Sequence, residues 1–180
     1  MYLEHGRPKD SAERTARELA VYDLLDRLEI SYERVDHAPA ETMEVCAAID
    51  EALNCRICKN LFLCNRQQTA FYLLMMPGDK PFKTKELSAQ IGSSRLSFAP
   101  AEKMVEYLGL YPGSVSVMGL MNDNEHKVQL LVDQDLFQDE YIGCHPCVNT
   151  SSLKLRRTDI FETFLPAVKH NYLSVELHGE

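Results

Sequence analysis

The chain has 180 residues, of which 45% are apolar and 26% charged, values that are ordinary for one globular domain with a substantial core. Its formal net charge of −8 argues against a generic nucleic-acid coat protein. Residues 1–53 hold 13 acidic and 6 basic residues, whereas residues 54–180 hold 14 and 13, so the second part could still present a basic face to RNA. The first ten residues lack the apolar centre of a signal peptide, and the longest apolar run, 70–76, is too short for a bilayer. We therefore expect a cytoplasmic protein with no membrane partner.

The first part of the chain predicts two helices and three strands. Residues 11–29 carry apolar residues at helical spacing, and Asp10 with Glu13 resembles a capping box. Thr42 is placed to cap a second helix over 42–53. Strands are expected at 30–35, 57–63 and 70–76. The short polar link between the last two predicts an antiparallel hairpin, which Pro77-Gly78 ends.

The second part interleaves helices and strands. Helices are expected at 83–91, stopped by Gly92, at 100–108, followed by Gly109, and at 159–168, capped by Thr158. Strands are predicted at 115–120, 128–132, 153–155 and 172–177. Because hairpins dominate, we predict an α+β fold, a single domain over residues 1–180 with a central mixed, mostly antiparallel sheet flanked by helices. Residues 1–19 would form an N-terminal extension or the start of the first helix.

Lys59 and Asn60 interrupt an otherwise apolar strand pattern. A lysine near a core loses hydration, and an uncompensated buried cation is costly. Lys59 therefore points either to open solvent or into a polar cleft where it faces something anionic. The first alternative is an ordinary exposed lysine, and the second is a binding site.

Two loops combine reactive residues with a permissive backbone. The stretch 109–119 has three glycines and two serines, and glycine lets backbone N–H groups face a ligand. It has neither the Walker nor the dinucleotide spacing, and a helix stop followed by a turn into a strand explains it equally well. In the stretch 143–152, His145 precedes a proline and is either a turn residue or a general base or hydrogen-bond donor. The G-x-S-x-G elbow of serine hydrolases is absent from the sequence.

Six cysteines in a chain without an export signal are expected to be free thiols. Cys55 with Cys58 and Cys144 with Cys147 form two C-x-x-C pairs, a spacing that can bind zinc. However, 85 residues separate the pairs, against roughly 15–20 in a compact zinc ribbon. We expect no metal and no other cofactor, and a zinc site on these four cysteines remains the alternative.

An ordered set of motifs resembles the YbaK-like prolyl-tRNA editing domain family, and most of all its free-standing, ProX-type Ala-tRNA(Pro) deacylase branch. The resemblance covers residues 20–177. No single motif is highly specific, and the order of the set is what identifies it. The motifs are Lys59-Asn-Leu-Phe-Leu, Ser97-Phe-Ala-Pro-Ala-Glu, Leu108-Gly-Leu-Tyr-Pro-Gly-Ser-Val, Val132-Asp133 and His145-Pro-Cys-Val-Asn-Thr.

The resemblance implies a mixed sheet flanked by helices and hydrolysis of the ester that links a wrong amino acid to tRNA(Pro). It implies catalytic roles for Lys59, Gly113 and His145, the last in shaping the pocket. It implies that water is the nucleophile, and that the substrate-binding residues are Asn60, Ser114, Val115, Val117 and Asn149. One position departs from the family, because the usual Gly-x-x-x-Pro loop here ends in Val117, which bears on how rigidly the amino-acid pocket is held.

The expected partners are the acceptor end of tRNA(Pro) and prolyl-tRNA synthetase, for a monomer or weak homodimer. Basic residues that could follow the tRNA are Arg56, Arg66, Lys80, Lys83, Lys85, Arg95, Lys154, Arg156 and Arg157. Three alternatives stay open: a deacylase for Cys- or Ser-charged tRNA, a non-catalytic module that binds an amino acid or aminoacyl-tRNA, and a zinc-binding protein.

Overall fold

Two β-sheets form the framework of the computed structural model, which describes residues 1–179. The smaller sheet is antiparallel throughout, with strand order β1-β2-β8-β7. Its strands are β1 (Leu3–His5), β2 (Glu33–Asp36), β7 (Tyr141–Cys144) and β8 (Ser151–Arg156). The N-terminal segment, expected to be an extension or the start of a helix, thus also contributes a short strand, β1.

The larger sheet has the order β5-β3-β4-β6-β9 and is mixed. Its strands are β3 (Cys58–Cys64), β4 (Phe71–Pro77), β5 (Ser97–Phe98), β6 (Val128–Asp133) and β9 (Tyr172–Val175). The predicted hairpin of β3 and β4 is confirmed, and β5 is antiparallel to β3. β6 and β9 run parallel to β4, so the prediction of an α+β fold with mixed strands is confirmed.

The two sheets approach each other at Ile57 and Gly143, which form an isolated parallel bridge. The Gly143 amide donates to the carbonyl of Arg56 at 2.9 Å. A Cβ atom on Gly143 would lie 2.9 Å from Cγ1 and 3.1 Å from Cα of Ile57. Because real Cβ atoms essentially never approach so closely, glycine at position 143 allows β7 to pass beside Ile57, the residue just before β3.

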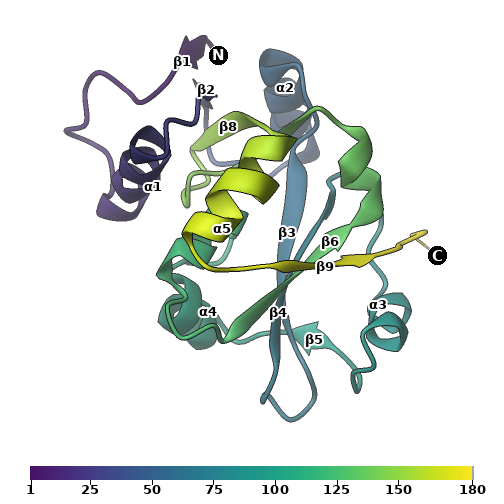
Figure 1. Cartoon of the computed structure of the whole chain (residues 1–180). Helices are drawn as coiled ribbons and strands as arrows, with labels where there is room; N and C mark the ends of the chain where they lie inside the picture. Colours follow the sequence, from purple (N-terminus) through teal and green to yellow (C-terminus); the bar gives the residue numbers. More distant parts are fainter. Residues whose placement is uncertain (180) are drawn as a thin grey trace.

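Local signals explain most of the helices. α1 (Ala16–Arg27) and α2 (Met43–Leu53) begin after Thr15 and Thr42, whose hydroxyls accept from backbone N–H groups two or three positions into the helix. The other helices are α3 (Thr84–Gln90), α4 (Ala101–Leu108), the π-helix η3 (Asp159–Phe164) and its continuation α5 (Leu165–Ala167). Figure 1 shows α2 near one end of β3, with α3, α4 and β5 toward the other.

Three sequence predictions were wrong in detail. Residues 115–120 are not a strand, because the 3₁₀-helix η1 covers Val117–Asn122; a second one, η2, covers Gln134–Gln138. Short apolar runs do not distinguish the two structures. α1 begins at Ala16 rather than at residue 11, because the Asp10 carboxylate accepts from the amide of Ala12 in a turn. Thr158 precedes η3 but makes no side-chain cap.

The main core lies where α1, α4, η1 and η3 meet the two sheets, and it includes Tyr22, Phe62, Leu73 and Phe164. A smaller core under α3 covers the opposite face of the larger sheet, with Leu63, Leu74 and Leu87. The two faces of β3 are therefore packed against different surroundings. None of the described helices is both long enough and apolar enough to cross a membrane.

Candidate active site

Lys59 and Asn60 lie on opposite faces of β3, because side chains alternate along a strand. Lys59 faces a cavity of about 470 Å³, which we call the basic pocket. Its lining consists of Lys59, Leu61, Phe82, Lys83, Thr84, Lys85 and Phe98. Three lysines and no carboxylate line this pocket, so its chemistry fits an anion.

Lys59 is half-buried at the edge of this pocket. Burial lowers the pKa of its ammonium group, and the more distant charge of Asp79 opposes this in part. Within residues 1–179, Lys59, Lys83 and Lys85 make no ion pair with a carboxylate. The cleft alternative for Lys59 is the one that this geometry favours, because the amine is partly desolvated and lacks a protein counter-ion.

Asn60 faces a second cavity of about 320 Å³, which we call the apolar pocket. It is lined by Asn60, Leu61, Phe62, Phe98, Ala99, Ala101, Met104, Pro112, Gly113 and Val115. The Asn60 amide donates to the Cys58 sulfur at 3.4 Å, but its Oδ1 atom is buried and has no hydrogen-bond partner among the described residues. An unpaired buried acceptor in a small apolar cavity is suited to a substrate N–H group.

Gly113 is the residue through which the glycine loop, residues 109–119, enters the lining of the apolar pocket. Its φ of +90° lies in the region that glycine adopts without strain, and a Cβ there would come within 3.7 Å of Nδ2 of Asn149. The backbone N–H groups of Gly113 and Val115 have no hydrogen-bond acceptor among residues 1–179. These two groups are candidate donors to an oxyanion formed beside the loop.

The remaining residues of the glycine loop hold it in shape. The Ser114 hydroxyl donates to the Tyr111 carbonyl at 2.7 Å. The Ser116 hydroxyl donates to the His145 carbonyl at 2.6 Å and accepts from the Met118 amide. Val117, fully buried, is the first residue of η1. Proline is favoured at the first helical position, so valine here occupies a place that suits the usual family proline.

His145 contacts the glycine loop through its backbone but lines neither pocket. Its ring Nδ1 atom lies 2.9 Å from the Ser151 carbonyl, and since a carbonyl only accepts, Nδ1 carries the proton. Nε2 has no partner among the described residues and is in contact with solvent. Burial lowers the pKa of His145, as does neighbouring His37, while the bond to Ser151 opposes the shift. The structure thus places His145 behind the pocket wall.

Sequence reasoning missed a second histidine that is joined to His145. Nδ1 of His37 donates to the Ala38 carbonyl at 2.7 Å, so its Nε2 accepts from the Ser152 hydroxyl at 2.9 Å. The Ser152 oxygen lies 3.1 Å from Nδ1 of His145, and the two rings are 6.0 Å apart. In the sequence His37 only marks the end of a strand, and no local signal pairs it with residues more than 100 positions away.

The four cysteines of the C-x-x-C pairs gather where the sheets meet, and all are free thiols. Burial raises the pKa of Cys58 and Cys147 to about 12. Burial also raises the pKa of Cys144, and Cys58 and Cys147 raise it further. Among residues 1–179 no three cysteine, histidine or acidic side chains are arranged to hold a metal ion.

Several of the basic residues expected to follow tRNA are already paired within the protein. Lys80 donates to Asp133 and Asp135 at 2.6 Å each and to the Leu177 carbonyl at 2.7 Å. Arg56 pairs with Asp139 at 2.8 Å. By contrast, Lys83 and Lys85 are exposed at the basic pocket, so they remain the clearest cationic groups near β3.

Known proteins of one family resemble this chain in sequence. Residues 37–163 match the aminoacyl-tRNA editing domain family. The prolyl-tRNA editing protein ProX of Acetoanaerobium sticklandii is 33% identical over 158 residues, which cover 88% of this chain and 96% of that protein. The prolyl-tRNA synthetase associated domain-containing protein 1 of Danio rerio is 28% identical over 150 residues, 82% of this chain and 80% of that protein.

Solved structures show the same fold. A crystal structure described as a candidate trans-editing enzyme for prolyl-tRNA synthetase matches with a TM-score of 0.67 at 15% identity, covering 91% of this chain and 99% of that one. Another, of a hypothetical protein, has a TM-score of 0.64 at 18% identity, covering 86% and 97%. Fold, pockets and matches together define a hydrolase of the aminoacyl-tRNA deacylase class. The chain belongs to the aminoacyl-tRNA editing domain family, which confirms the resemblance seen in the sequence.

Proposed function

We propose that the protein hydrolyses mischarged tRNA(Pro) in trans, in the cytoplasm, with Ala-tRNA(Pro) as its preferred substrate. The observation that carries the proposal is the pair of cavities on the two sides of β3, one cationic and one small and apolar, which share Leu61 and Phe98. An aminoacyl-tRNA end has the same two parts, a polyanionic strand and a small amino acid.

The basic pocket would hold the nucleotides at the 3′ end. Lys59, Lys83 and Lys85 would contact phosphate oxygens, and such charge-assisted contacts are the stronger class of hydrogen bond. Phe98, which is 64% exposed on the wall that the two cavities share, offers a flat face on which a base can stack. We expect the affinity for tRNA to be salt-sensitive, since phosphate contacts release counter-ions.

The apolar pocket would hold the amino acid. Oδ1 of Asn60 would accept from the substrate α-amino group, and the N–H groups of Gly113 and Val115 would stabilise the oxyanion. Water attacks the ester carbon, the bond to the ribose oxygen breaks, and the products are a free amino acid and tRNA with its hydroxyl restored. Discrimination against the larger, correct proline would depend on the fit of the pocket walls to the side chain rather than on total volume, and one methylene in an apolar pocket discriminates by only about 10–200-fold.

The test is deacylation of Ala-, Cys-, Ser- and Pro-charged tRNA(Pro) by the parent protein and by Lys59→Ala. We expect fastest release of alanine, and a loss of roughly 100-fold in kcat/KM for Lys59→Ala, because a charge-assisted contact contributes about 1.5–3 kcal/mol. Lys9→Ala, a change at an exposed lysine far from β3 in the sequence, is the matched control and should keep the parent rate.

The outcomes separate the parts of the proposal. If none of the charged tRNAs is released faster than in buffer, the proposed substrate is wrong. If cysteine or serine is released faster than alanine, the enzyme belongs to a sibling specificity of the same class. Equal rates for Lys59→Ala and Lys9→Ala would remove Lys59 from the site. Binding to prolyl-tRNA synthetase, the partner we propose, is measured separately by co-sedimentation of the two proteins.

A further inference from the structure

Helix α1 precedes residues 37–163, the part of the chain that matches the family model, yet its Arg17 contacts both loops of the candidate site. Val21, Tyr22 and Leu25 of its inner face are buried in the main core. Arg17 in its first turn and Arg14, just before the N-cap Thr15, both contact the second of the two loops described above. Figure 1 shows α1 beside the part of the molecule that contains β2 and β8.

Arg17 of α1 contacts both loops at once. Its Nε atom donates at 3.1 Å to the carbonyl of Cys147, which lies in residues 143–152, here called the His-Pro loop. Its guanidinium carbon lies 4.9 Å from the ring centroid of Tyr111 in the glycine loop, within cation–π range. Arg17 makes no ion pair with any of the described acidic residues. The side chain therefore acts as a brace between two segments that are more than 30 positions apart in the sequence, in addition to the direct bond from Ser116 to the His145 carbonyl.

Both contacts are connected to Gly113, which lines the apolar pocket. The Tyr111 carbonyl accepts both the amide and the hydroxyl of Ser114, and this turn contains Gly113. Cys147 has a φ of +63° although it is not glycine, and holding a non-glycine residue there costs about 1 kcal/mol. Such a residue persists only where its surroundings determine it, and its carbonyl is the atom that Arg17 binds. Asn149, two residues on, is the side chain nearest to Gly113.

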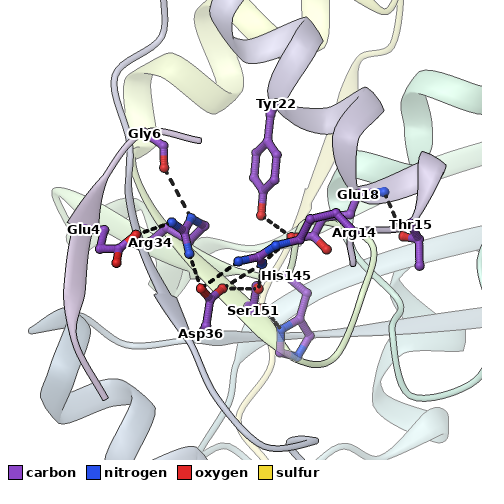
Figure 2. Close-up of polar contacts among 10 residues, drawn as sticks. All are labelled: Glu4, Gly6, Arg14, Thr15, Glu18, Tyr22, Arg34, Asp36, His145 and Ser151. Atoms are coloured by element: carbon purple, nitrogen blue, oxygen red, sulfur yellow. Dashed lines mark hydrogen bonds and ion pairs between the residues drawn. The ribbon is translucent and has the colours of Figure 1, made fainter. Parts of the chain in front are cut away.

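Arg14 fixes the far end of the same loop, as Figure 2 shows. It donates to Glu18 and to Asp36 at 2.9 Å and to the Ser151 hydroxyl at 3.2 Å. The Ser151 hydroxyl in turn donates to Asp36 at 2.6 Å, and its carbonyl accepts from His145. Arg34, only 1% exposed, completes the cluster by donating to Asp36 and to Glu4.

We propose that Arg17 is a positioning residue that holds the glycine loop against the His-Pro loop and so fixes where Pro112, Gly113 and Val115 line the apolar pocket. Arg17 reaches the substrate only through these loops, so it sets amino-acid discrimination rather than tRNA affinity. The cluster around Asp36 holds the start of α1, through Arg14 and Glu18, against Ser151 at the end of the His-Pro loop. This inference rests on the proposed function for its effect on specificity, but the brace itself is a property of the protein alone.

The variant that tests the brace is Arg17→Met, which keeps the apolar stem and removes the hydrogen bond and the planar cation. Arg27→Met, in the last turn of the same helix and exposed, is the matched control. Hydrogen–deuterium exchange of the intact protein without tRNA gives the first readout. We expect faster exchange of backbone amides in residues 111–116 and 144–150 for Arg17→Met, with exchange in β3 and β4 unchanged.

The second readout is the ratio of kcat/KM for Ala-tRNA(Pro) to that for Pro-tRNA(Pro). It should fall roughly tenfold or more in Arg17→Met, since small displacements in a site are costly, while KM for tRNA stays within about twofold. Arg17→Lys, which keeps the charge but not the planar group, should fall between Met and the parent. Arg27→Met should match the parent in both readouts.

Unchanged exchange in both loops would overturn the brace, whatever the activity shows. Faster exchange spread over the whole chain would also overturn it, because it indicates a general loss of stability. If the loops loosen but the ratio is unchanged, the specificity role fails. If the parent releases no amino acid at all, it is the proposed function that fails, and the exchange experiment still decides the brace.

Discussion

The pockets on the two sides of strand β3 share Leu61 and Phe98 in their walls but differ in charge and polarity. On one side the basic pocket has three lysines and no carboxylate. On the other, the apolar pocket of about 320 Å³ has one unpaired amide oxygen and a loop in which the N–H groups of Gly113 and Val115 have no acceptor among residues 1–179. In the proposed function, neighbouring residues of one strand would serve two tasks, recognition of charge by Lys59 and recognition of a small amino acid by Asn60. A change on one side should alter one task and leave the other intact.

The largest effect is expected from the basic side, in the double variant Lys83→Ala/Lys85→Ala. Both lysines are exposed at the basic pocket, so they should contribute to tRNA binding and not to the chemistry on the other face of β3. We expect KM for Ala-tRNA(Pro) to rise roughly 100-fold with kcat within about threefold. The slope of log KM against log salt should fall by about 1.4, at about 0.7 for each phosphate contact on a single strand.

The control for that experiment is Lys127→Ala/Lys169→Ala, which removes two exposed lysines from a different cavity. Its net charge equals that of the test variant, so general electrostatic attraction is matched. If the control raises KM and lowers the salt slope as much as the test variant does, the attraction is diffuse and the basic pocket has no special role.

An intermediate effect is expected on the apolar side from Asn60→Leu, which should raise stability and lower activity. The change replaces a buried acceptor that lacks a partner with an apolar group of similar size, which is neutral or stabilising by about 1 kcal/mol. The melting temperature should therefore rise by up to about 2–4 °C. Release of alanine should slow by roughly tenfold in kcat/KM, because the acceptor for the α-amino group is lost, with the salt slope unchanged.

A fall in melting temperature for Asn60→Leu would show that Oδ1 is satisfied in the folded protein. Unchanged alanine release would show that the amide does not contact the amino acid. Asn171→Leu is a suitable control for the general effect of this substitution, since Asn171 is exposed and lies at the entrance to β9.

Elements with local signals could be predicted from the sequence. Thr42 identified the start of α2, Gly109 the end of α4, and the polar link after β3 the hairpin, because each depends on residues a few positions apart. Strand β1 could not be predicted, since its three residues are ordered only by pairing with β2. The run 115–120 was misassigned because its apolar residues fit a strand as well as the 3₁₀-helix η1.

The candidate site followed the same rule. Lys59, Asn60, Gly113 and the His-Pro loop could be found as unusual residues within their own segments. Their distribution over two pockets follows from the alternation of side chains on β3, which the sequence contained but which needed the surrounding elements to interpret. Arg17 and His37 could not be found, because their partners Cys147 and Ser152 are more than 100 residues away and neither arginine nor histidine is unusual in its own segment.

The smallest expected effect lies behind both pockets, at His145. Burial and His37 lower the pKa of His145, so the ring is neutral in the folded protein at a pH where the unfolded chain begins to bind a proton. This group therefore lowers stability as pH falls through about 6.5, the ordinary value, and contributes nothing above it; the slope is at most about 1.4 kcal/mol per pH unit. Nitrogen-detected NMR should show the neutral ring protonated at Nδ1 and titrating below about 6.5.

Substituting His37 sharpens this prediction, because it removes the neighbouring imidazole while Ser151 still accepts from Nδ1. In His37→Asn the pKa of His145 should rise, since the neighbouring ring 6.0 Å away, which lowers it, is gone. Asp36 and Arg14 reach His145 only through Ser151, so their charges act on both proteins alike. If the titration midpoint of His145 does not move, His37 has no effect on its pKa. If the proton of the neutral ring is on Nε2, the hydrogen bond from Nδ1 to the Ser151 carbonyl is absent.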